Sequence, residues 1–116
     1  MASLYRNLIV WQKSFSLAEQ VYIATKDFPK EELYWLADQM RRASVSIPSN
    51  IAEWSGRGTN QEYIRFLNIA KWSCSEIETQ ILLAQKFAYI STETADILLG
   101  TCEEILKMLV ALIKKL

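Results

Sequence analysis

Arginine side chains are the groups in this sequence that are best suited to bind phosphate. Arg41 and Arg42 are adjacent, and Arg57 and Arg65 follow further along the chain. A guanidinium group keeps its charge and forms paired hydrogen bonds with phosphate oxygens, so these residues indicate a basic patch for RNA. The alternative is ordinary solvated charge, with the arginines in ion pairs to nearby carboxylates: Asp38, Glu53, Glu62 and Glu76. The balanced composition favours this alternative, and the sequence alone leaves both open.

Catalytic and metal-binding chemistry is poorly represented, because the sequence contains no histidine. This excludes Ser–His and Cys–His nucleophile pairs, zinc sites built on histidine, and the Glu-x-x-His element of di-iron helical bundles. The glutamates Glu53, Glu62, Glu76 and Glu78 place no clear pair on an inward-facing stripe. Cys74 and Cys102 fall on apolar stripes, which predicts small buried side chains and no disulfide. We therefore expect no enzyme, no catalytic residues, no metal and no cofactor.

Tryptophan is frequent in this chain, with four in 116 residues. Trp11 fits the apolar stripe of its segment, whereas Trp35, Trp54 and Trp72 do not fit theirs. An exposed tryptophan often marks a contact with another molecule, so these three are candidate interface residues. Packing at the periphery of the core, with the indole N–H satisfied, is an alternative of equal weight.

The composition of the chain predicts one globular domain over residues 1–116, with 51% hydrophobic and 22% charged residues. Only 3 Gly and 2 Pro interrupt it, which indicates few turns and long elements. Lys plus Arg and Asp plus Glu are 13 each, and zero net charge favours self-association over dedicated nucleic-acid binding. The sequence shows neither a signal peptide nor an apolar run of about 18 residues, so we expect a soluble, cytoplasmic protein without membrane contact.

Apolar residues recur three and four apart in four segments, which is the spacing that keeps one stripe of an α-helix facing a partner. The first stripe is Leu8, Trp11, Phe15, Ala18, Tyr22 and Thr25, and the second is Leu33, Leu36, Met40, Ala43 and Ile47. The third is Tyr63, Leu67, Ala70, Cys74, Ile77, Ile81, Ala84 and Ala88, and the fourth is Ala95, Leu98, Cys102, Ile105, Leu109, Leu112 and Leu116. In the last segment a second row widens the stripe, which indicates contact with more than one neighbour: Leu99, Leu106, Val110 and Ile113.

Capping and helix-breaking residues predict where these helices begin and end. Pro29 ends the first helix, and Pro48 should kink or end the second, because proline lacks the N–H that continues a helix. Thr59 or Asn60 is a plausible N-cap for the third helix, and Ser91 precedes the fourth. Short loops make successive helices antiparallel. We therefore predict an all-α fold, an antiparallel up-down four-helix bundle with almost no sheet.

Several runs of the sequence resemble the four-helix-bundle proteins encoded in intervening sequences of bacterial 23S rRNA genes. The longest is Arg-Arg-Ala-Ser-Val-Ser-Ile-Pro-Ser-Asn-Ile-Ala-Glu at 41–53, and Val-Trp-Gln-Lys-Ser at 10–14 precedes it. The resemblance continues through residues 22–25 and 28–29, through Phe-Leu-Asn-Ile-Ala-Lys at 66–71, and through Glu-Ile-Glu-Thr-Gln at 76–80. It covers about residues 8–90. The chain departs from the family where Trp35, Trp54 and Trp72 stand at positions that tend to be glycine.

The resemblance implies an antiparallel four-helix bundle that assembles into a ring, commonly a pentamer. Related bundles are accessory proteins of diversity-generating retroelements, in which a basic ring engages a reverse transcriptase and nucleic acid. By this resemblance, Arg41, Arg42, Arg57 and Arg65 are the candidate nucleic-acid-binding residues.

Two hypotheses follow from these observations. The first is a homo-oligomeric, non-enzymatic interaction protein that binds RNA, or a nucleic-acid-processing protein, through the arginines. The second is a protein–protein adaptor or scaffold with no nucleic-acid role, which would use the three tryptophans and the wide stripe of the last helix.

Overall fold

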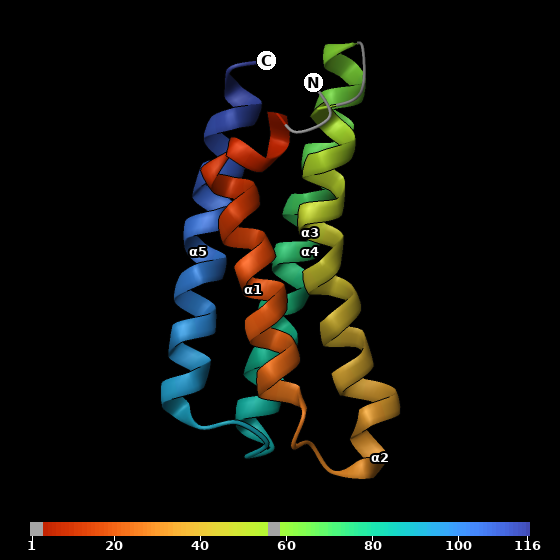
Figure 1. Ribbon diagram of the computed structural model, residues 1–116. Coiled ribbons are helices and arrows are strands. Elements are labelled where there is room, and N and C mark those ends of the chain that lie inside the picture. Colours follow the sequence, from red (N-terminus) through yellow and green to blue (C-terminus); the bar gives the residue numbers. More distant parts are fainter. Residues whose placement is uncertain (1–3, 56–58) are drawn as a thin grey trace.

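Four long helices make up most of the described chain (Figure 1). The computed structural model describes residues 4–55 and 59–116, with the side chains of Leu4, Trp54 and Ser55 left out. The long helices are α1 (Ile9–Thr25), α3 (Asp38–Ser55), α4 (Asn60–Lys86) and α5 (Thr92–Lys114). A short 3-10 helix, η1 (Leu4–Asn7), precedes α1, while α2 (Lys30–Glu32) and the π-helical η2 (Leu33–Ala37) lead into α3.

Successive long helices alternate in direction and form a bundle (Figure 1), which confirms the predicted fold class. Each long helix packs on two others, because the contacts run from α1 to α3, to α4, to α5 and back to α1. The bundle measures 44 × 22 × 21 Å. No strand is found in residues 4–55 and 59–116, and none of the helices there is both long and apolar enough to span a membrane.

The stripes predicted for α4 and α5 form the core. Fully buried residues recur along both helices, among them Leu67, Ala70, Cys74, Ile77 and Ile81 on α4 and Ala95, Cys102, Ile105 and Leu109 on α5. Capping also follows the prediction, since Thr59 Oγ1 accepts a hydrogen bond from the Glu62 N–H and Ser91 Oγ accepts one from the Thr94 N–H. The second row of α5 is half-buried.

Only part of the stripe predicted for α1 faces the core: Thr25 is fully buried, and Leu8 and Trp11 are partly buried against the core. The buried residues of α1 are Val10, Ser14, Leu17, Val21 and Thr25. Phe15 and Tyr22 of the predicted stripe lie on another side and are 49% and 51% exposed. Ser14 and Thr25 tolerate burial because their hydroxyls donate to backbone carbonyls of the same helix, at 2.9 Å to Trp11 and 2.8 Å to Val21.

Of the two outcomes predicted for Pro48, a kink or an end of the helix, the end does not occur, because α3 continues through it to Ser55. Ile47 and Ile51 stand on either side of Pro48 and are both fully buried. Ending the helix at Pro48 would remove Ile51 from the core, and burial of such a side chain is worth roughly 1.5–3 kcal/mol. Packing therefore offsets part of the helix-breaking cost of the proline.

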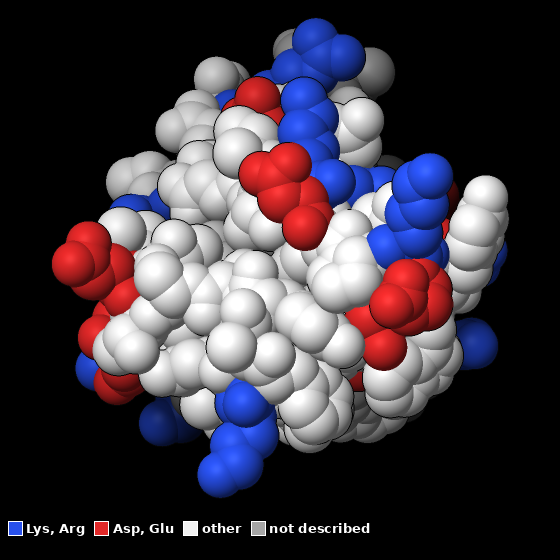
Figure 2. Space-filling model, turned by 90° about the horizontal axis from the view of Figure 1, so that it is seen from below, with Lys and Arg blue, Asp and Glu red and all other residues white. Residues whose placement is uncertain are grey.

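The end of the bundle that holds the α4–α5 turn has an aromatic cluster and few charges at its centre. The rings of Phe28 and Phe87 both lie against Tyr89, with centroid distances of 5.2 and 5.7 Å. Figure 2 shows this end with Lys, Arg, Asp and Glu gathered toward the rim of an uncharged surface. Partial burial and the adjacent Glu32 carboxylate raise the pKa of Tyr89.

Candidate functional site

Arg41 is folded back onto α1. Its Nε donates to Thr25 Oγ1 at 2.8 Å, and its guanidinium carbon lies 4.5 Å from the centroid of the Tyr22 ring. The side chain is half-buried. A cation over a ring face is attracted to it, so both contacts hold the arginine beside α1.

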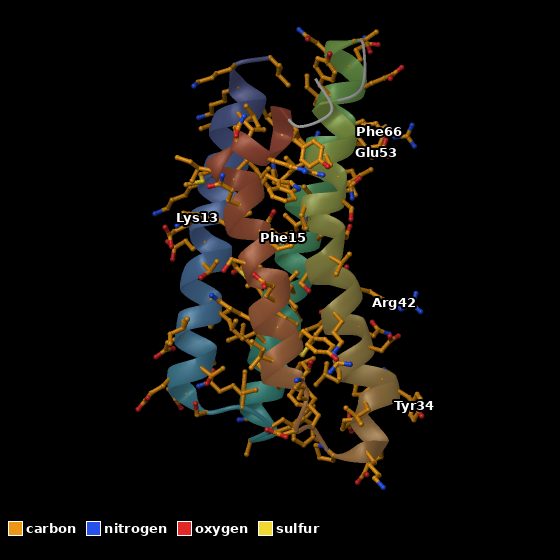
Figure 3. The ribbon with its side chains drawn as sticks, viewed as in Figure 1. Lys13, Phe15, Tyr34, Arg42, Glu53 and Phe66 are labelled. Carbon is orange, nitrogen blue, oxygen red and sulfur yellow. The ribbon has the colours of Figure 1, made fainter. Side chains whose placement is uncertain are left out.

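Arg42 points away from the bundle (Figure 3). Its Nε lies 2.9 Å from Asp38 Oδ2, one turn earlier on the same helix, and 80% of its side chain is exposed. Exposed pairs of this kind stabilise a protein by only about 0–1 kcal/mol. The guanidinium therefore stays accessible, although the carboxylate offsets its charge.

Arg65 is exposed on α4, far from Arg42. Ser46 and Ser73 set the register of α3 and α4, because their hydroxyls are 2.9 Å apart. In this antiparallel register Arg65 is level with the last turn of α3, roughly 18 Å along the axis from Arg42 at 1.5 Å per residue. Arg57 lies outside the described residues. Arg41, Arg42 and Arg65, the three candidate arginines that the structure describes, thus do not gather in one patch.

Trp35 and Trp72, which do not fit the predicted apolar stripes, are exposed. Trp35 is 52% exposed on η2 and Trp72 is 64% exposed on α4. The Trp54 side chain lies outside the described residues. Trp72 and Leu83 are three turns apart on one side of α4, since eleven residues return a helix nearly to the same angle.

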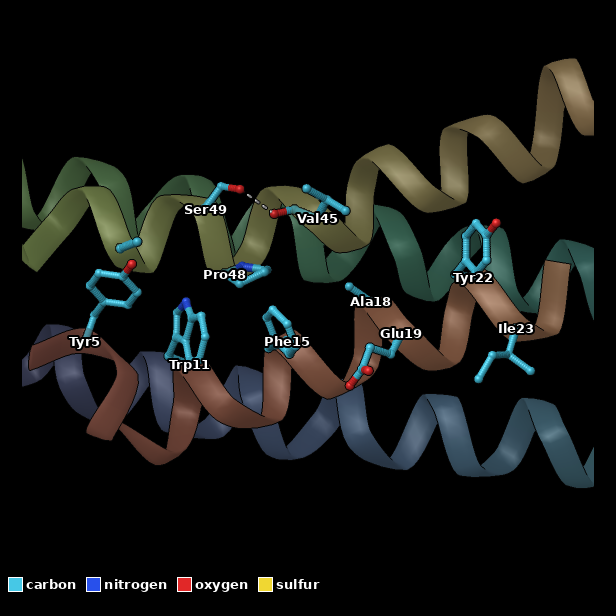
Figure 4. A pocket seen from close by; sticks show the side chains of 11 residues that line it. Tyr5, Trp11, Phe15, Ala18, Glu19, Tyr22, Ile23, Val45, Pro48 and Ser49 are labelled. Carbon is cyan, nitrogen blue, oxygen red and sulfur yellow. Dashed lines mark hydrogen bonds between the residues drawn. The ribbon is translucent and has the colours of Figure 1, made fainter. Parts of the chain in front are cut away.

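A groove between α1 and α3 has a volume of about 620 Å³. One wall is aromatic, and Figure 4 shows its side chains directed toward α3. The opposite wall comes from α3, where Pro48 presents its ring and Ser49 Oγ donates to the Val45 carbonyl at 2.8 Å. The complete lining is Tyr5, Trp11, Phe15, Ala18, Glu19, Tyr22, Ile23, Val45, Pro48, Ser49 and Ala52.

The aromatic residues of the groove form one row. The centroid of Trp11 lies 5.3 Å from that of Tyr5 and 5.0 Å from that of Phe15. Four of the lining residues, Trp11, Phe15, Ala18 and Tyr22, belong to the stripe that the sequence analysis assigned to the core. Sequence reasoning missed the groove because α1 also carries a second stripe, which is the one buried in the core. That stripe contains the polar Ser14 and was therefore not recognised as apolar.

Cations lie over the rings at both ends of this row. Arg6 lies 5.9 Å from the centroid of Tyr5, and Lys26 joins Arg41 at Tyr22 with a distance of 5.4 Å. Glu19 is the carboxylate among the lining residues. The lining itself is thus mainly apolar and aromatic, with no Lys or Arg in it, and the three cations lie over the rings at its two ends.

The two cysteine thiols are buried and have low reactivity. Burial raises the pKa of both Cys74 and Cys102 from the ordinary value of 9.0 to about 12, which keeps the thiols protonated and weakly nucleophilic. Both thiols are free. Among residues 4–55 and 59–116, no group of three or more His, Cys, Asp or Glu is placed to hold a metal ion.

Comparison with known proteins identifies the family. The family described as 23S rRNA-intervening sequence protein matches residues 6–111. The chain belongs to this family.

A solved structure of similar fold comes from Bacteroides thetaiotaomicron, a protein with unknown function from the S23 ribosomal protein family. It aligns with a TM-score of 0.83 and 27% sequence identity, over 91% of this chain and 99% of that chain. A comparison with curated proteins gives no match. The 23S rRNA-intervening sequence protein family thus accounts for nearly the whole chain and for its helical fold, while the neighbour's function is itself unknown.

Proposed function

We propose that this member of the family is a non-enzymatic interaction protein that assembles with copies of itself. The observation that carries the proposal is the exposure of Trp72, at 64%, on the same side of α4 as the partly exposed Leu83. Large apolar side chains grouped on a surface mark contacts with other proteins, and tryptophan is enriched in such contacts.

Trp35 is the other described tryptophan that is more than half exposed, and it lies on η2, which leads into the helix that packs on α4. The register of Ser46 against Ser73 puts η2 level with the last turns of α4, and thus Trp35 at the height of Leu83. Trp35, Trp72 and Leu83 are together called the tryptophan face.

The charges around the tryptophan face favour a second copy as the occupant. On α4, Arg65 precedes Trp72 by two turns and Glu76 follows it by one turn, so opposite charges flank the ring. Because the chain has zero net charge, two copies approach each other without an overall charge repulsion. A ring of five chains is the assembly that the family resemblance implies, and it is part of the proposal.

Solution mass measured by light scattering tests this proposal. We expect the protein to have a mass of several chains of 13.4 kDa each, and five chains if the ring forms. Trp35→Ser with Trp72→Ser should shift the mass toward one chain. Ile97→Ser, which changes a 63% exposed side chain on α5, is the control and should leave the mass unchanged. A wild-type mass of one chain at micromolar concentration would overturn the proposal.

A further inference from the structure

We propose that the α1–α3 groove receives Trp72 of a second copy of this chain, with Glu76 of that copy placed against Arg41 and Lys26. The inference rests on the proposed self-assembly, and it adds the surface on which the tryptophan face docks. A second copy is the occupant because its shape, its register and its charges all match the groove.

The groove holds apolar side chains that a single chain leaves partly exposed. Phe15 and Val45 lie on its opposite walls and are 49% and 53% exposed. Along the α1 wall, Ala18 presents only a methyl group between Phe15 and Tyr22, which leaves a gap in that wall (Figure 4). A large ring that enters this gap contacts aromatic side chains on both sides and removes apolar surface from water.

Trp72 cannot fill the groove of its own chain, because it faces another direction. The Ser73 hydroxyl bonds α3 and Cys74 is fully buried, so Trp72, about 100° further around α4, points outward on the side toward α3. The helices pack in the order α1, α3, α4, α5, which puts α4 diagonally opposite α1. Around a four-helix bundle, the groove and Trp72 therefore face directions roughly 90° to 135° apart. Each copy thus gives its Trp72 to one neighbour and receives that of another, and contacts at this angle close into a ring of about four to eight copies.

The register of the helices puts Trp72 at the height of the gap. The bond from Arg41 to Thr25 fixes the height of α3 against α1, and the bond between the Ser46 and Ser73 hydroxyls fixes that of α4 against α3. Counting along the helices from these bonds at 1.5 Å per residue places Trp72 level with the gap to within about one turn. In a closed ring whose axis runs along the bundles, all copies lie at the same height. Trp72 of one copy therefore meets the gap of the next.

The charges beside the gap are complementary to those beside Trp72. Glu76 is exposed one turn after Trp72 on α4, which brings its carboxylate to the height of Tyr22. Over the Tyr22 ring lie two cations, with the Arg41 guanidinium carbon 4.5 Å and Lys26 Nζ 5.4 Å from the centroid. A carboxylate of the neighbouring copy thus meets two positive charges, and opposite charges across an interface fix its register.

Light scattering of two complementary variants tests this contact. Phe15→Lys places a charge in the groove of a chain that keeps its tryptophan face. Trp35→Ser with Trp72→Ser removes the face from a chain that keeps its groove. We expect each variant alone to lose the wild-type mass, with a dissociation constant roughly 30- to 1000-fold higher. Mixed in equal amounts in concentrated solution, the two should form a complex of two chains, because one intact groove then meets one intact Trp72.

Substitutions on both walls and outside the groove complete the set. Val45→Lys, on the opposite wall, should dissociate the assembly as Phe15→Lys does. Ile9→Lys is the matched control, because Ile9 is 61% exposed on α1 but does not line this groove, and it should keep the wild-type mass. Circular dichroism checks that every variant is folded.

An exchange of charges tests the pairing at Tyr22. Glu76→Lys should raise the dissociation constant at least about fivefold, because a lysine there faces two cations. Lys26→Glu added to the same chain should lower the dissociation constant again. Such a rescue is not expected if Glu76 acts only within its own chain.

Four results would overturn the inference: folded groove variants that keep the wild-type mass, complementary variants that do not combine, dissociation by Ile9→Lys, or no rescue by the charge exchange. Self-assembly itself would stand in each of these cases, since the wild-type mass would still be that of several chains. A wild-type mass of one chain would instead overturn the proposed function, and with it this contact.

Discussion

Ala88 has a backbone conformation that suits glycine better. Its φ of 63° lies in the left-handed region, and it stands just after α4. The Ala88 N–H donates to the Gln85 carbonyl and the Tyr89 N–H donates to the Ala84 carbonyl, both at 2.9 Å. These two bonds define the motif that closes many helices, in which glycine is the usual left-handed residue because a Cβ is strained there.

Replacing Ala88 by glycine should therefore stabilise the protein. We expect Ala88→Gly to raise the free energy of unfolding by about 1 kcal/mol, measured by urea unfolding. Ala111→Gly is the matched control, since Ala111 is exposed within α5 and the same change there should cost roughly 0.5–1 kcal/mol. Destabilisation by both substitutions would show that the left-handed strain is not relieved at Ala88.

At the scale of the element, sequence reasoning succeeds where the apolar stripe of a helix is also its buried side, even though α4 buries the polar Ser73 and Gln80 beside that stripe. Cys74 and Cys102 sit on such stripes, and α4 and α5 were placed correctly with their caps. It fails in α1 because Ser14 is buried while Phe15 is exposed, so hydrophobicity alone selects the wrong side. It also could not decide between a kink and an end at Pro48, because burial on both sides of the proline is a tertiary effect that local propensity does not contain.

The π-helical segment η2 was not predicted. It determines which residues just before α3 face the core and which face solvent. A π turn is in effect an α-helix with one residue inserted. Within η2, Tyr34 is 91% exposed while Leu36 and Ala37 are buried. The extra residue thus leaves the core side of α3 in register and projects an aromatic side chain outward (Figure 3).

Deleting Tyr34 should convert η2 to ordinary α-helix at small cost. The deletion leaves every core contact from Leu36 onward in place, and it rotates the short α2 together with the half-buried Leu33. Deletion of the exposed Thr79 is the control, because it rotates the rest of α4 by about 100° and turns Ile81 and Ala84 out of the core. We expect this control to cost more than about 3 kcal/mol in thermal or urea unfolding. Equal losses for the two deletions would contradict the role given to the π turn.

At the scale of the whole molecule, the sequence specifies the bundle more completely than the site. Four stripes and few breakers are sufficient for four antiparallel helices, because each stripe must be buried against another element. Surface positions have no such constraint. Arg41 and Arg42 are neighbours in sequence, yet one lies against α1 and the other points to solvent, which only the packing of α3 on α1 determines. The site therefore required the structure.

Self-assembly also predicts how the whole molecule unfolds. One cluster of buried residues runs through all four long helices, so each chain should unfold in a single cooperative transition. If folded chains associate and unfolded chains do not, mass action makes stability depend on chain concentration. A hundredfold increase in concentration should then add on the order of 1–2 kcal/mol per chain and raise the urea midpoint.

Substitutions in the tryptophan face test the dependence of stability on concentration. In Trp35→Ser with Trp72→Ser, both changed side chains are more than half exposed, so the core of each chain is untouched. The urea midpoint of this variant should no longer change with concentration, whereas Ile97→Ser should keep the wild-type dependence. A wild-type midpoint that is constant over the hundredfold range would mean that folding and association are not linked, and that the exposed tryptophans serve a partner other than a second copy.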